Sequence, residues 1–468
     1  MSMSNFDSNA QGELWIVSDR IERSPGHPFY VKLNRLLHEE GFDRRIEELR
    51  APYYKEGGRP SIPLGVYFRM LLAGYFEGID SQRGIAWRCA DSLSLREFLG
   101  LELTARTPDH SSLTRIRKRL PLEVHEQMFA MVLEIAQRRG LLRGKTILVD
   151  STTLEADAAM RSIVRKDTGE NWTQYVSRLA EAEGIHEPSA EDLARYDRKR
   201  KGKKVSNEDW ESRTDPDARI TKMKDGTTHL AYKGEHAVDL DSGLILAAAI
   251  EPGDSADAQT LTSRVIDAQV NLIRAGSEQA VEEAVADKGY HKTESLGGLA
   301  AIGIRAYIPE KKERGKRRSY QWTPEHNEAY RANRRRTRGV RGRRLLRRRG
   351  ELVERSFAHV CETGGARRTW IRGAGEVAKY FQLRTLAFNL GVLLRWLFGI
   401  GKPRSLQTPI NRLMGAIFSR FRLQAALIGA ICLLNLLLTQ AGRMADAAII
   451  QLTSTYRLMG KSPYSTGC

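Results

Sequence analysis

The sequence predicts an α/β protein: a mixed sheet flanked by helices, preceded by an all-α N-terminal domain and followed by a helical C-terminal tail. Three patterns support this class. Apolar residues recur at helical spacing early in the chain, short apolar runs bounded by turn residues follow, and helical spacing returns near the end. The expected boundaries are an N-terminal extension over 1–25, a helical domain over 26–140, an α/β domain over 141–400 and the tail over 401–468.

Length and charge narrow the function classes. The chain has 468 residues, enough for two or three domains, and a net charge of +18, which indicates a polyanionic partner. The spacing of its four cysteines matches neither a zinc site nor a disulfide framework, which favours reduced thiols. We find no signal-peptide pattern, and the longest apolar stretch, 425–438, is too short to cross a bilayer. We therefore expect a cytoplasmic protein that does not enter a membrane.

The helical domain is expected to contain short helices separated by tight turns. Candidate helices cover residues 82–90, 94–99 and 111–120. Ser94 and Ser111 are possible caps of the last two. A longer amphipathic helix begins near Pro121 and ends before Gly140. Short helices with tight turns are compatible with a helix-turn-helix that reads DNA and with an ordinary helical bundle, and both interpretations remain open.

The α/β domain is expected to begin with a buried strand over 145–149 that ends on Asp150. Two more strands, over 230–239 and 244–251, are joined by a turn, which favours an antiparallel meander. The remaining expected elements are a helix over 256–275, a strand over 281–286 that runs into Asp287, a turn at Gly289, a helix through Leu299, a strand over 304–309, and helices over 351–361 and 377–398. We expect the last helix to pack on the sheet.

Positive charge is concentrated in residues 311–349, which hold 17 Lys and Arg against three Glu. Guanidinium groups bind phosphates bidentately, and aromatic rings can stack on unpaired bases, so this basic segment with Trp322 favours nucleic-acid binding over a merely solvated surface. A second run, 198–204, lies in a polar stretch, about 161–228, that reads as a loop or insertion. The candidate DNA-binding residues are Arg334, Arg335, Arg336, Arg343, Arg344, Arg347, Arg348, Arg355 and Trp322.

Three acids could form a metal site. Asp150 and Asp287 each follow a predicted strand, and Glu354 lies on the helix directly after the basic segment. Mg²⁺ prefers oxygen ligands, and two or three carboxylates from separate elements suffice to hold it. Each acid also has an ordinary structural explanation as a turn former or helix cap. The neighbouring acids Glu155, Asp157 and Glu351 are competitors.

Four segments, taken with their order, resemble the catalytic core of DDE insertion-sequence transposases. They are TILVDSTTLEADA from Thr146, LAYKGEHAVDLDSGLI from Leu230, AVADKGYHKTESL from Ala284 and ELVERSFAHVCETGGARRTWIRG from Glu351. The stretch from Gly58 to Leu101 also resembles the helical domain that precedes this core in one bacterial group. The resemblance covers roughly residues 25–400. It implies a ribonuclease H-like fold for the α/β domain.

The resemblance implies that Asp150, Asp287 and Glu354 are the catalytic acids and hold two Mg²⁺ ions, with Mn²⁺ as a substitute. Many relatives carry a tyrosine seven residues before the glutamate, an arginine four residues before it and a lysine seven residues after it. Here those positions are Arg347, Gly350 and Cys361, which makes Arg347, Arg348 and Arg355 the candidates for phosphate binding.

Other residues of the motifs have weaker implied roles. Some relatives use an aromatic residue before the glutamate helix to hold a flipped base, which makes Trp322 a candidate for that role. His236 and His291 lie in the core motifs, where a phosphate contact is possible and a hydrogen-bonded structural role is the more common one.

The implied activity is transposition: binding of the inverted-repeat ends of an insertion sequence, metal-dependent cleavage, and transfer of the 3′-hydroxyls to target DNA. Two ends must meet, so a homodimer on double-stranded DNA, associated with a bacterial nucleoid, is expected. The alternatives are a ribonuclease H-like nuclease without strand transfer and a catalytically silent DNA-binding relic. Inverted repeats flanking the reading frame would favour the transposase.

Overall fold

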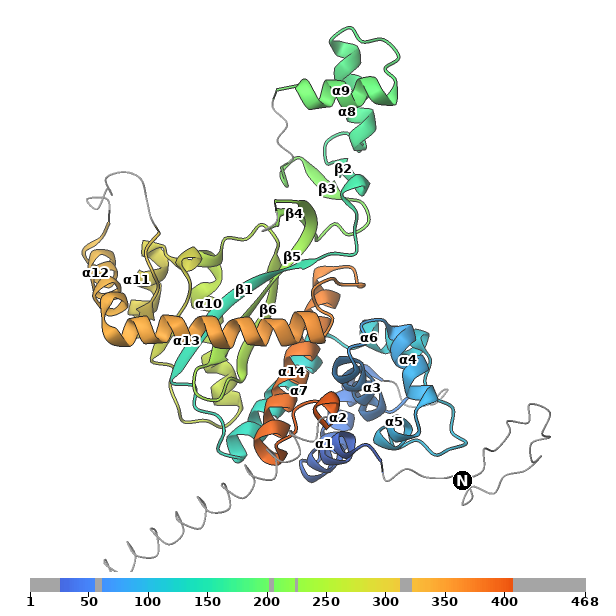
Figure 1. Ribbon diagram of the computed structural model, residues 1–468, viewed down its shortest axis with the longest axis vertical. Helices are drawn as coiled ribbons and strands as arrows, with labels where there is room; N and C mark the ends of the chain where they lie inside the picture. The colour runs from blue at the N-terminus through green and yellow to red at the C-terminus, as the bar shows by residue number, and fades with distance from the viewer. Residues whose placement is uncertain (1–25, 55–60, 202–205, 224–225, 312–321, 407–468) are drawn as a thin grey trace, which may run out of the picture. The chain divides into compact units, whose positions relative to one another are not determined.

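The α/β part of the protein is built on a six-stranded mixed sheet (Figure 1). The structure is a computed structural model, and it describes residues 26–54, 61–201, 206–223, 226–311 and 322–406. The expected N-terminal extension, almost all of the expected tail and residues 312–321 of the basic segment lie outside the described residues.

Helices precede the sheet, as the sequence predicts. They are α1 (Pro28–Glu39), α2 (Phe42–Arg50), the 3₁₀ turn η1 (Ala51–Tyr53), α3 (Leu64–Glu77), α4 (Gln82–Asp91), α5 (Leu93–Phe98), α6 (His110–Arg119) and α7 (Leu122–Arg138). Helix α3 is buried along nearly its whole length, because apolar residues cover all its faces. It therefore forms the centre of this helical region.

The predicted short helices are confirmed, but two predicted caps are wrong. Helix α5 is capped by Ser92, whose Oγ accepts a hydrogen bond from the Leu95 amide (3.3 Å). Helix α6 is capped by Asp109, whose Oδ1 accepts from the Ser112 amide (2.7 Å). The caps are not Ser94 and Ser111, because a good capping side chain stands two residues before each of them and starts the helix earlier.

The sheet follows the predicted meander and then continues with parallel strands. Its strands are β1 (Thr146–Glu155), β4 (Arg219–Lys222), β5 (Thr228–Asp239), β6 (Ile245–Pro252), β7 (Glu283–Val285) and β8 (Arg305–Tyr307). Strand β5 is antiparallel to β1 on one side and to β4 and β6 on the other. Strand β7 is parallel to both β1 and β8. The order β6–β5–β1–β7–β8 thus combines an antiparallel and a parallel half.

The prediction that the first strand ends on Asp150 is wrong. Strand β1 runs on to Glu155, because β5 keeps pairing with it as far as the pair Glu155–Ala231. Strand β7 stops pairing at Leu148, so Asp150 lies in mid-strand just beyond the last residue that β7 covers. The residue therefore pairs with β5 on one side and has no strand partner on the other.

The predicted helices around the parallel strands are confirmed with small shifts. They are α10 (Asp257–Arg274), the 3₁₀ turn η3 (Lys288–Tyr290) and α11 (Thr293–Ala301). Helix α10 packs against β6, β5 and β1 and also contacts α7. This contact joins the N-terminal helices to the sheet.

Of the two interpretations of the polar stretch 161–228, a loop or an insertion, the loop is wrong. It contains the 3₁₀ turn η2 (Met160–Ser162), β2 (Ile163–Arg165), α8 (Trp172–Ala182), α9 (Ala190–Lys199), β3 (Trp210–Ser212) and β4. Strands β2 and β3 form a separate two-stranded sheet. The ring of Trp210, which is buried, packs on Trp172 and on Tyr175 with centroids 5.3 Å apart in each case. A few aromatic residues thus form a small core without a long apolar period.

Among the described residues after the sheet are three α-helices: α12 (Pro324–Arg338), α13 (Val340–Phe357) and α14 (Ala374–Phe398). The π-helical turn η5 (Ala358–Thr363) follows α13, and the 3₁₀ turn η6 (Pro403–Leu406) follows α14. Figure 1 shows α13 lying across the sheet, and it contacts β1. The helix predicted from residue 351 begins at Val340, so the second half of the basic segment is part of it. Helix α14 packs on the sheet as predicted: a Cβ on Gly234 would lie 3.0 Å from the ring of Phe381.

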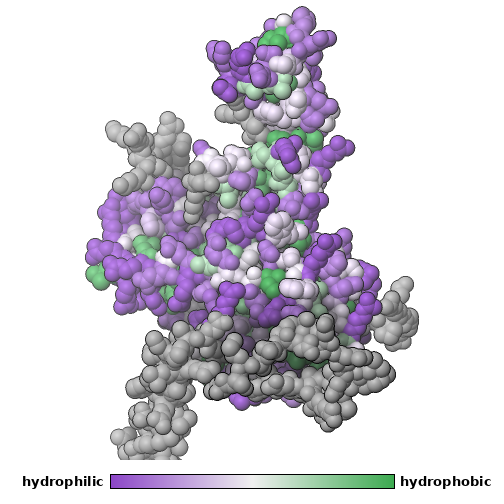
Figure 2. Space-filling view, turned by 45° about the vertical axis from the view of Figure 1, so that its right-hand side comes forward, coloured by the Kyte–Doolittle hydropathy of each residue, from purple (hydrophilic) through white to green (hydrophobic). Residues whose placement is uncertain are grey.

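The face of the protein drawn in Figure 2 carries mainly hydrophilic side chains, with small hydrophobic areas between them. Among the described helices, none combines the length and the apolar character needed to cross a membrane.

Candidate active site

Asp150 is held on β1 by neighbours from three elements. It pairs with His236 of β5, its Oδ1 accepts a hydrogen bond from the Ser151 amide (2.9 Å), and its Oδ2 forms an ion pair with Nη2 of Arg349 on α13 (2.6 Å). The pKa of Asp150 is raised to about 6, mainly by burial and to a smaller extent by the negative charges of Asp287 and Asp257, against the opposing effects of Arg349 and the Ser151 amide. The carboxyl group thus lies in a region of converging acids.

Asp287 occupies the matching position after the neighbouring strand. In the parallel pairing, Leu148 is opposite Val285, and each aspartate follows its paired residue by two positions. The effect of Asp287 on the pKa of Asp150 agrees with this proximity. Asp287 caps the turn η3, where its Oδ1 accepts from the Gly289 amide (2.6 Å). The two aspartates are thereby fixed at the same edge of the sheet.

A third acid, Asp257, stands beside them and was not predicted. It is the first residue of α10, and its Oδ1 accepts from the Ser151 hydroxyl (2.9 Å) and pairs with Nζ of buried Lys233 (2.7 Å). A Cβ at Gly289 would lie 2.6 Å from Asp257 Oδ2 and 2.8 Å from Asp287 Oδ1, so only glycine fits between these carboxylates. Acids are common in the first turn of helices, so the sequence carried no distinctive signal for Asp257.

Glu354 lies on the exposed side of α13. Within the described ranges, no three acid, histidine or cysteine side chains are gathered closely enough to hold a metal ion. The structure therefore brings Asp150 and Asp287 together and leaves Glu354 outside a compact ligand cluster. A Cβ on Gly350, one helical turn before Glu354, would have Glu354 Oε1 at 3.9 Å as its nearest contact.

The donors at the sheet edge nevertheless suit a magnesium ion. Asp150 and Asp287 offer hard carboxylate oxygens from two rigid elements, and Mg²⁺ is commonly held by one or two carboxylates with waters and substrate phosphates completing its shell. Glycine at 289 also leaves room for the carboxylates of Asp257 and Asp287, which both lie close to its Cα.

The predicted DNA-binding arginines divide into two groups. Arg336 is turned inward: its Nε donates to the Ala306 carbonyl (3.0 Å), and burial lowers its pKa. Arg334 and Arg348 are exposed and pair with Glu310 (3.2 Å) and Glu351 (3.2 Å). The remaining candidates, all exposed, are Arg335, Arg343, Arg344, Arg347 and Arg355.

The aromatic candidate and the two motif histidines are packed against neighbouring rings. Trp322 is half-buried and lies 5.2 Å from the ring of Tyr330, which His291 also contacts at 5.8 Å. His236 is fully buried, bonds through Nε2 to the Ser356 hydroxyl (2.9 Å) and stacks on Phe357 at 3.7 Å. Burial lowers the pKa of His236 to about 3, so its ring is neutral and links β5 to α13.

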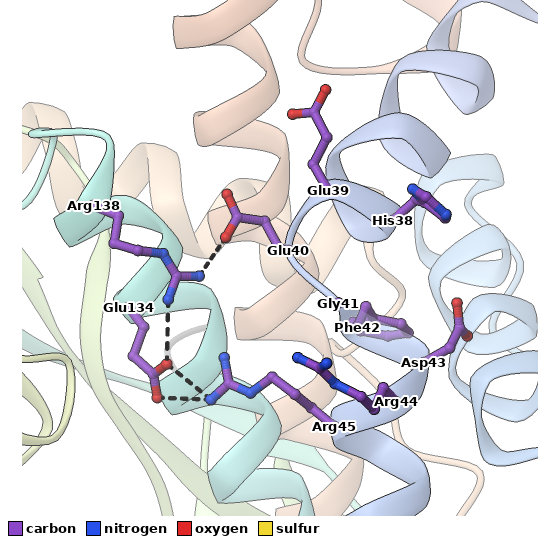
Figure 3. Close-up of a pocket in the computed structure, with 10 residues that line it drawn as sticks. All are labelled: His38, Glu39, Glu40, Gly41, Phe42, Asp43, Arg44, Arg45, Glu134 and Arg138. Atoms are coloured by element: carbon purple, nitrogen blue, oxygen red, sulfur yellow. Dashed lines mark hydrogen bonds and ion pairs between the residues drawn. The ribbon is translucent and has the colours of Figure 1, made fainter.

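A separate pocket lies among the N-terminal helices (Figure 3). It is formed by the turn between α1 and α2 and by α7, and has a volume of about 690 Å³. Its charges are largely paired: Arg45 bonds Glu134 (2.8 Å), and Arg138 bonds Glu40. These pairs fasten the helices to one another, and the pocket contains none of the acids at the sheet edge.

Comparison with known proteins defines first the class and then the family. The sheet, with its antiparallel half followed by a parallel half, belongs to a ribonuclease H-like domain, as the resemblance implied. The family model described as "Transposase DDE domain" matches residues 142–390, more than half of the chain. The chain therefore belongs to the transposase DDE domain family. A second model, "Transposase domain (DUF772)", matches residues 18–119.

Two other comparisons add little to this assignment. No curated protein matches the chain. One similar solved structure is described as "Mos1 transposase paired-end complex with left transposon end"; it is 10% identical, and the match covers 66% of this chain and 82% of that chain with a TM-score of 0.18. The assignment rests on the family models, because so low a TM-score carries no structural argument.

Proposed function

We propose that the protein is a DNA transposase that binds the inverted-repeat ends of its insertion sequence, cleaves them by two-metal phosphodiester hydrolysis and joins the 3′-hydroxyls to target DNA. The observation that carries the proposal is the proximity of Asp150 and Asp287, each two residues past the last paired residues of β1 and β7. Membership of the transposase DDE domain family supports it.

In this proposal Asp150, Asp287 and Glu354 hold the divalent ions, Mg²⁺ or Mn²⁺. A bound ion would supply charge to activate the attacking hydroxyl and stabilise the leaving oxygen. The protein's own residues hold and orient the DNA: exposed arginines of α12 and α13 bind its phosphates. Helix α13 also bears Glu354. The chemistry therefore depends on positioning and on charge neutralisation.

We also propose that residues 26–140 form the DNA-binding or dimerisation domain and that residues 141–400 form the catalytic domain. Two transposon ends must be handled together, so the working form would be a homodimer on double-stranded DNA.

The test is cleavage and joining of labelled DNA that carries the flanking repeat, in Mg²⁺ and in EDTA. We expect wild-type protein to nick the repeat tip and form joined products only with metal. Asp287→Asn should lower the rates of nicking and joining by at least about a hundredfold, because it removes a proposed ligand of the divalent ions that stabilise the developing charge. Asp241→Asn is the matched control, since Asp241 is an exposed carboxylate in the turn between β5 and β6 and should leave both reactions unchanged.

Each alternative predicts a different outcome of the same assay. Nicking without joined products would identify a nuclease. Tight DNA binding by the wild type without cleavage under any divalent metal would contradict the proposal and identify a silent DNA-binding protein.

A further inference from the structure

Arg349 differs from the other arginines of α13 in where its side chain lies. Only 14% of the side chain is exposed, compared with 52% for Arg341 and 51% for Arg348. It follows Leu345 by four residues and precedes Leu352 by three, so it belongs to the buried face of the helix, where both leucines lie. Its guanidinium therefore points toward the sheet.

This guanidinium forms an ion pair and a hydrogen bond with β1. Nη2 lies 2.6 Å from Asp150 Oδ2, and Nε lies 3.4 Å from the Val149 carbonyl. The other carboxylate oxygen, Oδ1, is already bonded by the Ser151 amide at 2.9 Å. Both oxygens of Asp150 are thus engaged by the protein itself, one of them by a full positive charge.

We propose that Arg349 is a positioning residue that competes with a divalent ion for Asp150. In the metal-free protein it neutralises and orients this carboxylate, and it gives up Oδ2 when the ion binds. Two cations that share one oxygen repel each other, so Arg349 lowers the affinity of the site for metal. This inference rests on the proposed function, in which Asp150 is a metal ligand.

The arrangement has a direct consequence for DNA. The guanidinium that leaves Asp150 remains attached to α13, beside the exposed Arg347 and Arg348. A phosphate is a suitable new partner, because guanidinium binds phosphate and carboxylate in the same bidentate geometry. DNA would therefore favour release of Arg349 and thereby strengthen metal binding, and by reciprocity metal would strengthen DNA binding.

The test is Mn²⁺ binding to the full-length, DNA-free protein, measured by titration calorimetry at constant pH and salt. A neighbouring opposite charge changes the proton affinity of a carboxylate by about one to three pKa units, so we expect Arg349→Ala to tighten Mn²⁺ binding about tenfold. Arg349→Lys should remain near wild type because it keeps the charge. Arg178→Ala, which removes an exposed arginine of α8 paired with Glu170, should leave the affinity unchanged.

Two further variants keep the inference separable from the proposed function. Asp150→Asn should abolish this binding in both the wild-type and the Arg349→Ala background. If the wild-type protein binds no Mn²⁺ through Asp150, the proposed function fails. If it binds Mn²⁺ and Arg349→Ala binds equally or more weakly, the role of Arg349 is overturned. Arg349→Gln provides a neutral variant of similar length should the alanine variant fail to fold.

Discussion

At the scale of single residues, Asp150 shows a conflict between folding and the proposed chemistry. The pKa of this carboxyl is about 6 in the folded chain, mainly because of burial, and an unfolded chain has an aspartate pKa of about 3.9. The folded state therefore binds more protons between these values. Stability that comes from this group is complete below about pH 4 and is lost as the pH rises through 6.

Because ionisation of Asp150 lowers the stability of the folded state, a variant that cannot ionise at this position should be more stable at high pH. In EDTA, Asp150→Asn should match wild type near pH 4 and exceed its free energy of unfolding by about 1–3 kcal/mol above pH 7. Denaturant unfolding at a series of pH values measures the difference. Asp241→Asn controls for the loss of one carboxylate at the surface, and a gap between wild type and Asp150→Asn that stays constant from pH 4 to 8 would contradict the prediction.

At the scale of elements, the sequence predicted the types and order of the sheet elements well and their ends poorly. The run before Asp150 is recognisably a strand, but its continuation to Glu155 depends on pairing with β5, and register with a distant strand leaves no local pattern. In the stretch 161–228, the capping pairs Asn171–Gln174 and Ser189–Asp192 were readable signals of α8 and α9, and they were missed.

The candidate site was also predictable only in part from the sequence. Asp150 and Asp287 could be placed near each other because each follows a short apolar run that predicts a strand. The inward position of Arg349 was not found, because the helix was expected to begin at residue 351 and its phase was not extended back through the arginines. Proximity of Asp257 depends on how α10 packs on the sheet, which helical periodicity does not reveal.

A substitution at Gly350 tests whether the space beside Glu354 on α13 is needed for cleavage. Glycine inside a helix costs about 0.5–1 kcal/mol relative to alanine, and a Cβ at this position would meet only Glu354 Oε1, at 3.9 Å. Gly350→Ala should therefore raise the free energy of unfolding by about 0.5–1 kcal/mol. It should also slow DNA cleavage, because the added methyl group occupies space beside a proposed catalytic acid.

Opposite effects on stability and cleavage would show that the glycine is kept for the site. Gly375→Ala is the matched control: this glycine lies in the first turn of α14, and a Cβ there would meet no atom within 4 Å. The control should leave cleavage unchanged. If Gly350→Ala cleaves DNA as fast as wild type, the space beside Glu354 is not needed.

At the scale of the whole molecule, the N-terminal helices and the α/β part are connected by polar contacts as well as by packing. Arg117 Nε of α6 bonds Glu376 Oε2 at the start of α14 (2.7 Å), and Lys379 Nζ donates to the Arg117 carbonyl (3.1 Å). The indole of Trp370 donates to Asp80 Oδ2 (2.8 Å). Burial acts to raise the pKa of Glu376, but the hydrogen bonds from Lys379 and Arg117 outweigh it and lower the pKa. The charged form of Glu376 is thus stabilised by this junction.

The Arg117–Glu376 pair should therefore contribute measurably to holding the two parts together. Its side chains are only 13% and 23% exposed, so solvent and salt screen it less than a surface pair. We expect a double-mutant cycle of Arg117→Ala and Glu376→Ala in denaturant unfolding to give a coupling energy of about 1–2 kcal/mol. The Arg44–Glu48 pair, 3.9 Å apart with side chains 81% and 68% exposed, is the matched control and should give a coupling near zero. Equal coupling in the two cycles would mean that the junction depends on packing, as between α7 and α10, and not on this ion pair.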